Sequence, residues 1–289
     1  MTGPWTGARA LDPPRLRAGG RIRGLSPAVV AVGVFVFLGI FGPVITPYDP
    51  TAQDLSGTLA QPSTTHMLGT DNLGRDEFSR ILAGARTSLV AVTLIAGFAV
   101  SIGLLVGVTA GFLGGRVDLL LMRGADLFIA LPSLILGLAL LGIVGPSMAT
   151  IVLALGVSWW PIYARLSRAQ VRTTRRLPYV EALTVLGASR RRILGRHLIP
   201  AVIGPLVILL SADAGNILLT VAMLSFLGLG IQPPTPEWGQ MMADAKPYLE
   251  SNPLLIIAPG IAITLVVIGF NILGEHLTLK FDPASRSKG

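Results

Sequence analysis

Long apolar stretches, separated by short polar segments, fill most of this 289-residue sequence after Leu25. A helix needs about 20 mostly apolar residues to cross a hydrocarbon core of about 30 Å, because each residue adds about 1.5 Å. Stretches of this kind predict an all-α membrane protein, built as a six-helix transmembrane bundle. The predicted spans lie near 25–46, 88–112, 119–144, 147–163, 198–224 and 253–273.

The composition agrees with a membrane protein. Hydrophobic residues make up 52% of the chain and charged residues 13%, whereas soluble domains carry roughly 25% charged residues. The first apolar run also differs from a cleavable signal peptide, because it continues beyond the roughly 7 to 15 apolar residues typical of such peptides. We therefore expect a retained first helix and no large soluble domain.

Basic residues predict the side of the membrane on which each loop lies, because lysine and arginine are retained on the cytoplasmic side. With the N-terminus inside, the cytoplasmic segments hold 19 of the 23 Lys and Arg residues, and the opposite orientation reverses this split. An even number of spans puts the C-terminus inside as well. The expected parts are a cytoplasmic tail at 1–24, a first helix at 25–46, an extracytoplasmic segment at 47–87, a five-helix core at 88–273 with a cytoplasmic loop at 165–197, and a cytoplasmic tail at 274–289.

Several chemical functions are not expected. The basic residues that give the chain its formal charge of +8 lie between apolar spans, not in soluble sequence with interleaved aromatic residues. This placement favours a lipid bilayer and no nucleic acid as the partner. The chain has no cysteine and no G-x-x-x-x-G-K-[ST] motif for ATP. His66, His197 and His276 are isolated, without the spacing of a metal site or a catalytic triad. We expect no catalytic residue, no metal site and no cofactor bound by this chain.

The cytoplasmic loop at 165–197 is too polar to span a membrane and too patterned for a plain linker. A first short helix is predicted over 179–186, because Pro178 suits the first position of a helix. Gly187 suits the backbone angles of a helix end, and Ser189 suits the cap of a second helix at 190–197 that leads to Pro200.

This loop resembles the E-A-A-x3-G-x9-I-x-L-P segment of permeases from binding-protein-dependent ABC importers. In that family the loop forms a coupling helix that inserts into a groove on the ATPase subunit. The chain departs from the pattern at Leu183, His197 and Ile199, which replace alanine, isoleucine and leucine. The resemblance implies ATPase-coupling roles for Glu181, Ala182, Leu183, Gly187, Ala188, His197 and Pro200. For single arginines of the loop, the alternative is a topology signal that touches anionic lipid.

Longer runs extend the resemblance to the second, or C-type, permease of dipeptide, oligopeptide and nickel ABC importers. The runs are 66–76, 84–89, 111–132, 224–239 and 270–283. A departure is Val221, where relatives often carry glutamate.

The resemblance implies a multi-pass protein of the bacterial cell membrane that imports peptides by alternating access. It implies a heterodimer with a homologous second permease, two ABC ATPase subunits or one fused pair that bind ATP and Mg, and an extracytoplasmic solute-binding protein. Nickel, a metal-chelator complex, glutathione or an oligosaccharide remains open as the solute. An intramembrane enzyme and an ATPase-independent channel are the rival classes, and the sequence offers no paired catalytic constellation for the enzyme.

Further residues are candidates for the path and for docking. An ionisable group at membrane depth is costly, so Asp213 is expected to face the bundle or a wet cavity. Asp213 is expected to line the translocation path together with Ser211 and Asn216. The alternative is that Asp213 only stabilises the packing of one helix against another. The outer segments around 46–86 and 226–252 are the expected docking surface for the binding protein. Its candidate residues are Asp71, Arg75, Gln232, Glu237 and Trp238.

Two packing features are also expected within the spans. Arg123 and Asp126 lie three residues apart, which favours an ion pair within one helix. Small residues let two helices approach closely, and the candidates for such an approach are Gly97, Gly103, Gly107 and Gly111.

Overall fold

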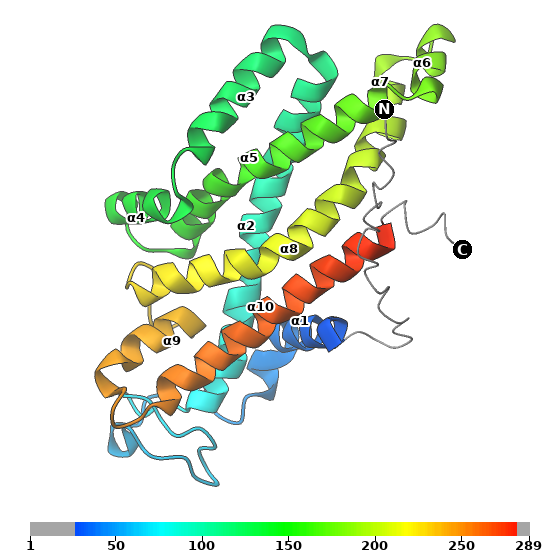
Figure 1. Cartoon of the computed structure of the whole chain (residues 1–289). Helices are drawn as coiled ribbons and strands as arrows, with labels where there is room; N and C mark the ends of the chain where they lie inside the picture. Colours follow the sequence, from blue (N-terminus) through cyan, green and yellow to red (C-terminus); the bar gives the residue numbers. More distant parts are fainter. Residues whose placement is uncertain (1–26, 282–289) are drawn as a thin grey trace, which may run out of the picture.

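The computed structural model describes residues 27–281, which fold into a bundle of long helices arranged around α2 (Figure 1). The tail predicted at 1–24 lies outside the described residues, and the tail predicted at 274–289 is helical up to Phe281. The helices are α1 Pro27–Ile45, α2 Glu77–Leu113, α3 Gly115–Ile129, α4 Ser133–Val144, α5 Met148–Arg175, α6 Pro178–Val185, α7 Arg190–Ile193, α8 Ile199–Phe226, α9 Trp238–Ala245 and α10 Leu254–Phe281. The predicted all-α membrane class is confirmed.

Four helical runs are long and apolar enough to cross a bilayer: α2, α5, the continuous run from α7 through α8, and α10. α1 is a shorter apolar helix. The prediction of one continuous helix over 119–144 is wrong, because α3 and α4 meet at an angle of 81°. The break falls at Pro132, which has extended backbone angles just before α4. Proline lacks an amide hydrogen and disfavours helical angles in the residue before it, so the chain turns there.

Two long helices extend beyond their predicted spans. α2 begins at Glu77 rather than near 88, because Asp76 caps its first turn by accepting a hydrogen bond from the Ser79 amide at 2.8 Å. α5 continues to Arg175, so the loop predicted from 165 starts after this helix. In both cases the polar end of the helix lies outside the apolar stretch that marks the span.

Glycines hold α2 and α5 close together. A Cβ atom at Gly103, Gly107 or Gly111 would overlap with the backbone or side chains of α5. The predicted close approach is therefore confirmed at these three positions. It is wrong at Gly97, where a Cβ atom would meet nothing within 4 Å.

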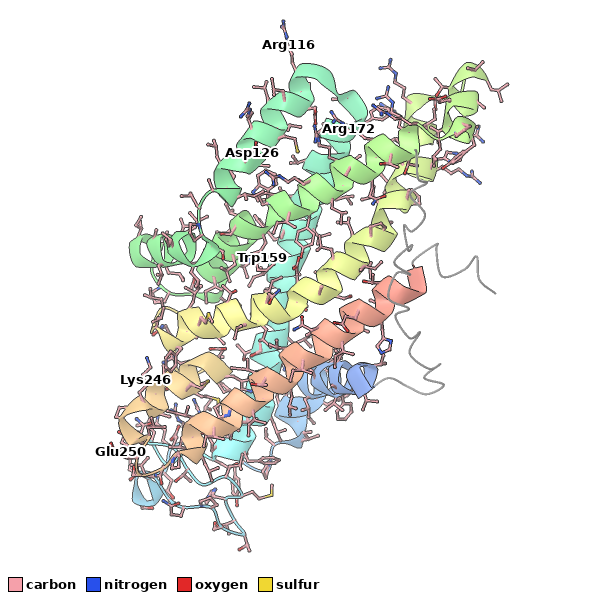
Figure 2. The ribbon with its side chains drawn as sticks, viewed as in Figure 1. Arg116, Asp126, Trp159, Arg172, Lys246 and Glu250 are labelled. Carbon is pink, nitrogen blue, oxygen red and sulfur yellow. The ribbon has the colours of Figure 1, made fainter. Side chains whose placement is uncertain are left out.

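The core consists of two clusters of buried apolar side chains. One joins α1, α2, α8 and α10 to α9 through Trp238. The other joins α2, α5 and α8 to α6 through Val180. α6 and α7 lie at one end of the molecule, and α9 lies with the loop before α2 at the other (Figure 1). Arg116 on α3 lies at the same end of the molecule as α6, whereas Lys246 and Glu250 lie at the same end as α9 (Figure 2).

Candidate functional site

The loop between α5 and α8 presents α6 beyond the end of the long helices (Figure 1). α6 begins with Pro178 in its first turn, as the sequence predicts. The side chain of Val180 on α6 is buried, and so are those of Ile193 and Leu198 further along the loop. These three side chains pack in the same apolar cluster as α5 and α8. The loop is thus fixed to the bundle along one side.

Gly187 ends α6 with a backbone φ of +79°. Its amide donates to the Thr184 carbonyl at 3.1 Å, and the Ala188 amide donates to the Leu183 carbonyl at 3.0 Å. This pair of bonds is the Schellman motif, in which glycine takes the left-handed conformation that other residues adopt at a cost. The predicted break at Gly187 is confirmed, and so is the predicted cap by Ser189, which accepts from the Arg192 amide.

The second helix of the loop differs from its prediction. α7 covers Arg190–Ile193, and a π-helical turn at Leu194–Leu198 joins it to α8 without a break. Pro200 is the second residue of α8, which directly follows the π-helical turn. The ring of His197 lies 5.9 Å from that of Tyr179 on α6.

The outer face of α6 carries exposed side chains. Val185 is 87% exposed and Leu186 is 82% exposed. Glu181 and Ala182 are exposed as well, whereas Leu183 and Ala188 are half-buried. Two large apolar side chains this exposed at the end of a short, fixed helix form a surface suited to a protein partner.

Ion pairs join α3 to α5 near this loop. Asp118 on α3 accepts hydrogen bonds from the guanidinium groups of Arg168 and Arg172 on α5, and Asp126 accepts from Arg165 at 2.6 Å (Figure 2). The predicted pair of Arg123 with Asp126 is therefore wrong, since Asp126 pairs with α5. The recurrence of aspartates on α3 and of arginines on α5 is the sequence signal that could have indicated ion pairs between these two helices.

Asp213 lies on the side of α8 that faces α5. Its carboxylate lies beside the hydroxyl of Tyr163, and both groups are buried without a hydrogen bond of good geometry. Ser211 donates to the Val207 carbonyl of its own helix at 2.8 Å, and Asn216 is exposed. The structure therefore does not bring Ser211, Asp213 and Asn216 together at one point.

The outer segment before α2 contains a buried charge network. Arg75 is 2% exposed and donates from Nε to the Asp71 carboxylate at 2.6 Å. Arg80, also buried, lies 3.5 Å from the same carboxylate, and Asp244 on α9 lies 4.0 Å from Arg75. His66 pairs with Asp76 at 2.8 Å. These charges join the outer segment to α2 and α9.

Glu237 and Trp238 are buried at the start of α9. Glu237 caps the helix by accepting from the amides of Gly239 and Gln240 at 3.0 and 2.9 Å. Burial raises the pKa of this carboxyl group, against the opposing effect of those hydrogen bonds. Trp238 donates to the Ile81 carbonyl at 3.0 Å.

The candidate docking residues are thus mostly internal. Direct docking through the side chains of Asp71, Arg75, Glu237 and Trp238 does not fit this burial, because each already contacts its own chain. Gln232 is exposed. Balanced charges spaced four residues apart, such as Asp71 with Arg75, are the signal that could have indicated internal pairing.

The residues between 27 and 281 contain no group of three His, Asp and Glu side chains placed to hold a metal ion. Apolar helices of bilayer length and a fixed loop beyond them define a polytopic membrane protein that presents a partner surface at one end. Residues 103–287 match the family described as "Binding-protein-dependent transport system inner membrane component". The chain belongs to this family.

Relatives cover nearly the whole chain. The nickel transport system permease protein NikC of Escherichia coli (strain K12) is 39% identical over 89% of this chain and 92% of its own length. The probable D,D-dipeptide transport system permease protein DdpC of the same strain is 38% identical over 90% and 88%. The glutathione transport system permease protein GsiD of Pectobacterium atrosepticum is 39% identical over 89% and 87%.

The fold is similar to that of solved ABC transporters. A chain of the MetNI methionine ABC transporter in inward-facing conformations aligns with a TM-score of 0.56 and 20% identity, covering 70% of this chain and 95% of that one. An amino acid ABC transporter aligns with a TM-score of 0.55 and 16% identity, covering 70% and 94%. Together with the family, these comparisons confirm the predicted importer permease fold, the non-catalytic permease function and the inner-membrane location.

Proposed function

We propose that this chain imports peptides as one of two homologous permeases in an ABC importer. One of the three relatives described above is named for a D,D-dipeptide. In this proposal, two ATPase subunits or one fused pair bind ATP and Mg, and a solute-binding protein delivers the peptide from outside. The N- and C-termini and the α5–α8 loop lie in the cytoplasm, following the distribution of basic residues.

The single observation that carries the coupling assignment is the presentation of α6. Its exposed end at Val185 and Leu186 is fixed to the bundle by the buried Val180 and by the turn at Gly187. In the proposed mechanism, ATP-driven closure of the ATPase subunits moves α6, and the packed contacts of the loop pass this displacement to α5 and α8. Two global states, open to opposite sides of the membrane, then alternate. Glu181, Ala182, Leu183, Ala188, His197 and Pro200 belong to the same proposed coupling segment.

The proposed path and docking surface use exposed residues. Asn216 on α8 is exposed and is proposed to face the path between the two permeases. Asp213 is proposed to support this face by holding α8 against Tyr163 of α5. On the outer side, Leu55, Met67 and Gln232 are exposed, and they are proposed to meet the binding protein.

Gly187→Val tests the coupling assignment. A β-branched residue at positive φ is strained, and left-handed angles cost a non-glycine residue roughly 1 to 2 kcal/mol. We expect this strain to displace α6 from its position on the ATPase subunit. A cost of about 1.4 kcal/mol corresponds to a decrease of about tenfold in peptide uptake by reconstituted vesicles. Assembly with the ATPase subunits should remain normal.

Gly195→Val is the matched control. Gly195 lies in the same loop, has no positive φ, and a Cβ atom there would meet nothing within 4 Å. Uptake by this variant should stay close to wild type. Normal uptake by Gly187→Val in an assembled complex would disprove the coupling role.

A separate measurement tests the solute. The binding protein that co-purifies with the importer is denatured, and its released ligand is identified by mass spectrometry. A di- or oligopeptide supports the proposal. Nickel, a metal-chelator complex, glutathione or an oligosaccharide would replace the di- or oligopeptide as solute while leaving the permease function intact.

A further inference from the structure

A cleft of about 690 Å³ opens between the end of α2, the end of α5 and α6. This volume lies within the range of about 300 to 1,000 Å³ that small-molecule sites occupy. Its walls are formed by glycines at the end of α2, arginines at the end of α5 and the exposed face of α6. The lining residues are Gly111, Gly114, Arg172, Arg175, Arg176, Glu181, Thr184 and Val185.

The three arginines retain free hydrogen-bond donors. Arg172 uses one Nη atom for Asp118 at 2.5 Å, and Arg175 uses one Nη atom for the Phe112 carbonyl at 2.7 Å. Among residues 27–281, no side-chain hydrogen bond or ion pair of Arg176 is found. A guanidinium has five N–H donors in a planar fork that matches phosphate oxygens. Most of the donors that line the cleft are therefore available to a ligand.

The charge of the cleft selects an anion. Three arginines and Glu181 give its walls a formal charge of +2, and Asp118 is already occupied by two arginines. Gly114, which lines the cleft, precedes α3 without a side chain that caps the first amides of this helix. Amides at a helix start also favour negative charge.

The cleft lies beside the end of an apolar helix. The apolar stretch of α2 ends at Leu113, next to Gly114, which lines the cleft. Leu105 and Leu113 are exposed on the face of α2 opposite to Gly107 and Gly111, which pack against α5. A bilayer around this apolar face would bring the headgroups of one leaflet to the level of the cleft.

We propose that the cleft between α2, α5 and α6 binds the phosphate group of an anionic phospholipid from the surrounding leaflet. Basic pockets at the cytoplasmic ends of membrane helices suit such headgroups. Because α6 forms one wall, the bound lipid connects α5 to α6 and limits their relative movement. The phosphate is assigned to the arginine wall, which leaves Val185 and Leu186 at the exposed end of α6 to the proposed ATPase contact. The inference requires a chain embedded in a bilayer and does not rest on the identity of the solute.

The test uses the complete importer complex, reconstituted in nanodiscs of phosphatidylglycerol and phosphatidylcholine in equal amounts. After transfer to detergent, native mass spectrometry counts the phosphatidylglycerol that remains bound. The wild-type complex should retain it in preference to phosphatidylcholine. Arg176→Gln and, as a second variant, Arg172→Gln should each weaken retention about tenfold, which corresponds to about 1.4 kcal/mol.

Arg191→Gln is the matched control, because Arg191 is an exposed arginine of α7 outside the cleft. Retention by this variant should equal that of the wild type. Equal losses in all three variants would show diffuse attraction of lipid and overturn the proposal. The same follows if the wild-type complex holds no lipid and Arg176→Gln instead releases the ATPase subunits.

Free phosphate is the other source of the same chemistry. Equilibrium dialysis of the detergent-purified complex against radiolabelled inorganic phosphate distinguishes the two. No binding at millimolar concentration supports the lipid as ligand. Phosphate binding that Arg176→Gln abolishes, without selective lipid retention, would assign the cleft to a soluble anion and overturn the lipid assignment.

Discussion

Glu237 places a carboxyl group in the interior of a membrane protein, and its hydrogen bonds explain how. Both oxygens accept from amides at the start of α9, where the helix dipole also favours negative charge. Burial nevertheless raises the pKa of this group. The folded protein therefore binds the proton more tightly than the unfolded chain does. Its contribution to stability is greatest below the ordinary pKa of 4.5 and decreases as the pH rises through the raised value.

Glu237→Gln isolates this effect, because glutamine does not titrate. We predict that the stability of the wild type relative to Glu237→Gln decreases as the pH rises above about 4.5. Thermal unfolding of the purified complex at a series of pH values measures this difference, and other titrating groups affect both proteins alike. A difference that stays constant or grows with pH would contradict the raised pKa.

Asp213 and Tyr163 offer a second test at the residue scale. If the pair holds α8 against α5, Asp213→Asn should leave peptide uptake within about twofold of wild type. A double-mutant cycle with Tyr163→Phe should give a coupling energy of at most about 0.6 kcal/mol, the average for side-chain hydrogen bonds between membrane helices, because the two groups lie side by side without a well-formed hydrogen bond. Unfolding in detergent gives the energies, and reconstituted vesicles give the uptake. Loss of uptake in a normally assembled Asp213→Asn complex would instead place Asp213 in the path.

At the scale of elements, the sequence predicts the apolar part of each helix better than its ends. The spans follow from hydrophobicity alone, but α2 begins at Glu77 because Asp76 caps it and because Arg80 is buried against Asp71. Such an end depends on contacts between distant segments, which hydropathy does not contain. The break at Pro132 is different, since a proline inside an apolar run was a local signal that could have been read.

In the candidate site, too, local features were predictable from the sequence, and contacts between distant elements were not. The turn at Gly187 and the cap at Ser189 are local and were predictable from residue type. The pairing of Asp126 with Arg165 across two helices was not, because it depends on how α3 packs against α5. The burial of Arg75 likewise depends on the tertiary position of α9. Residues whose role depends on a partner element were therefore the ones misjudged.

The contact between α2 and α5 gives a prediction at the element scale. At Gly107, an added Cβ atom would overlap with the Ala164 carbonyl oxygen, which cannot move without shifting the backbone of α5. Gly107→Ala should therefore destabilise the permease by about 1 to 3 kcal/mol, as overpacking of a tight core does. Thermal unfolding in detergent and the yield of assembled complex measure the loss.

Gly97→Ala on the same helix is the control for this prediction. A Cβ atom there meets nothing within 4 Å, and alanine favours a helix over glycine by about 1 kcal/mol. This variant should be as stable as the wild type or more stable. Equal losses at the two positions would show that the helix contact is not the cause.

At the scale of the whole molecule, the two ends of the bundle differ in construction. The end with α9 holds its charges inside, in pairs that fix the outer segment to the helices. The end with α6 leaves several arginines and the apolar side chains of Val185 and Leu186 exposed. An importer of the proposed kind meets a binding protein at one end and ATPases at the other. Exposed side chains at each end should therefore contact different partners.

Photo-crosslinking from two matched positions tests this arrangement. Leu55 before α2 is 71% exposed and Val185 on α6 is 87% exposed, so an apolar photoreactive residue can replace either without disturbing the core. During turnover of the complete importer, the probe at 55 should capture the binding protein and the probe at 185 an ATPase subunit. The products are identified by mass spectrometry. Capture in the reverse order would invert the proposed orientation, and capture of one partner by both probes would refute the separation of the two ends.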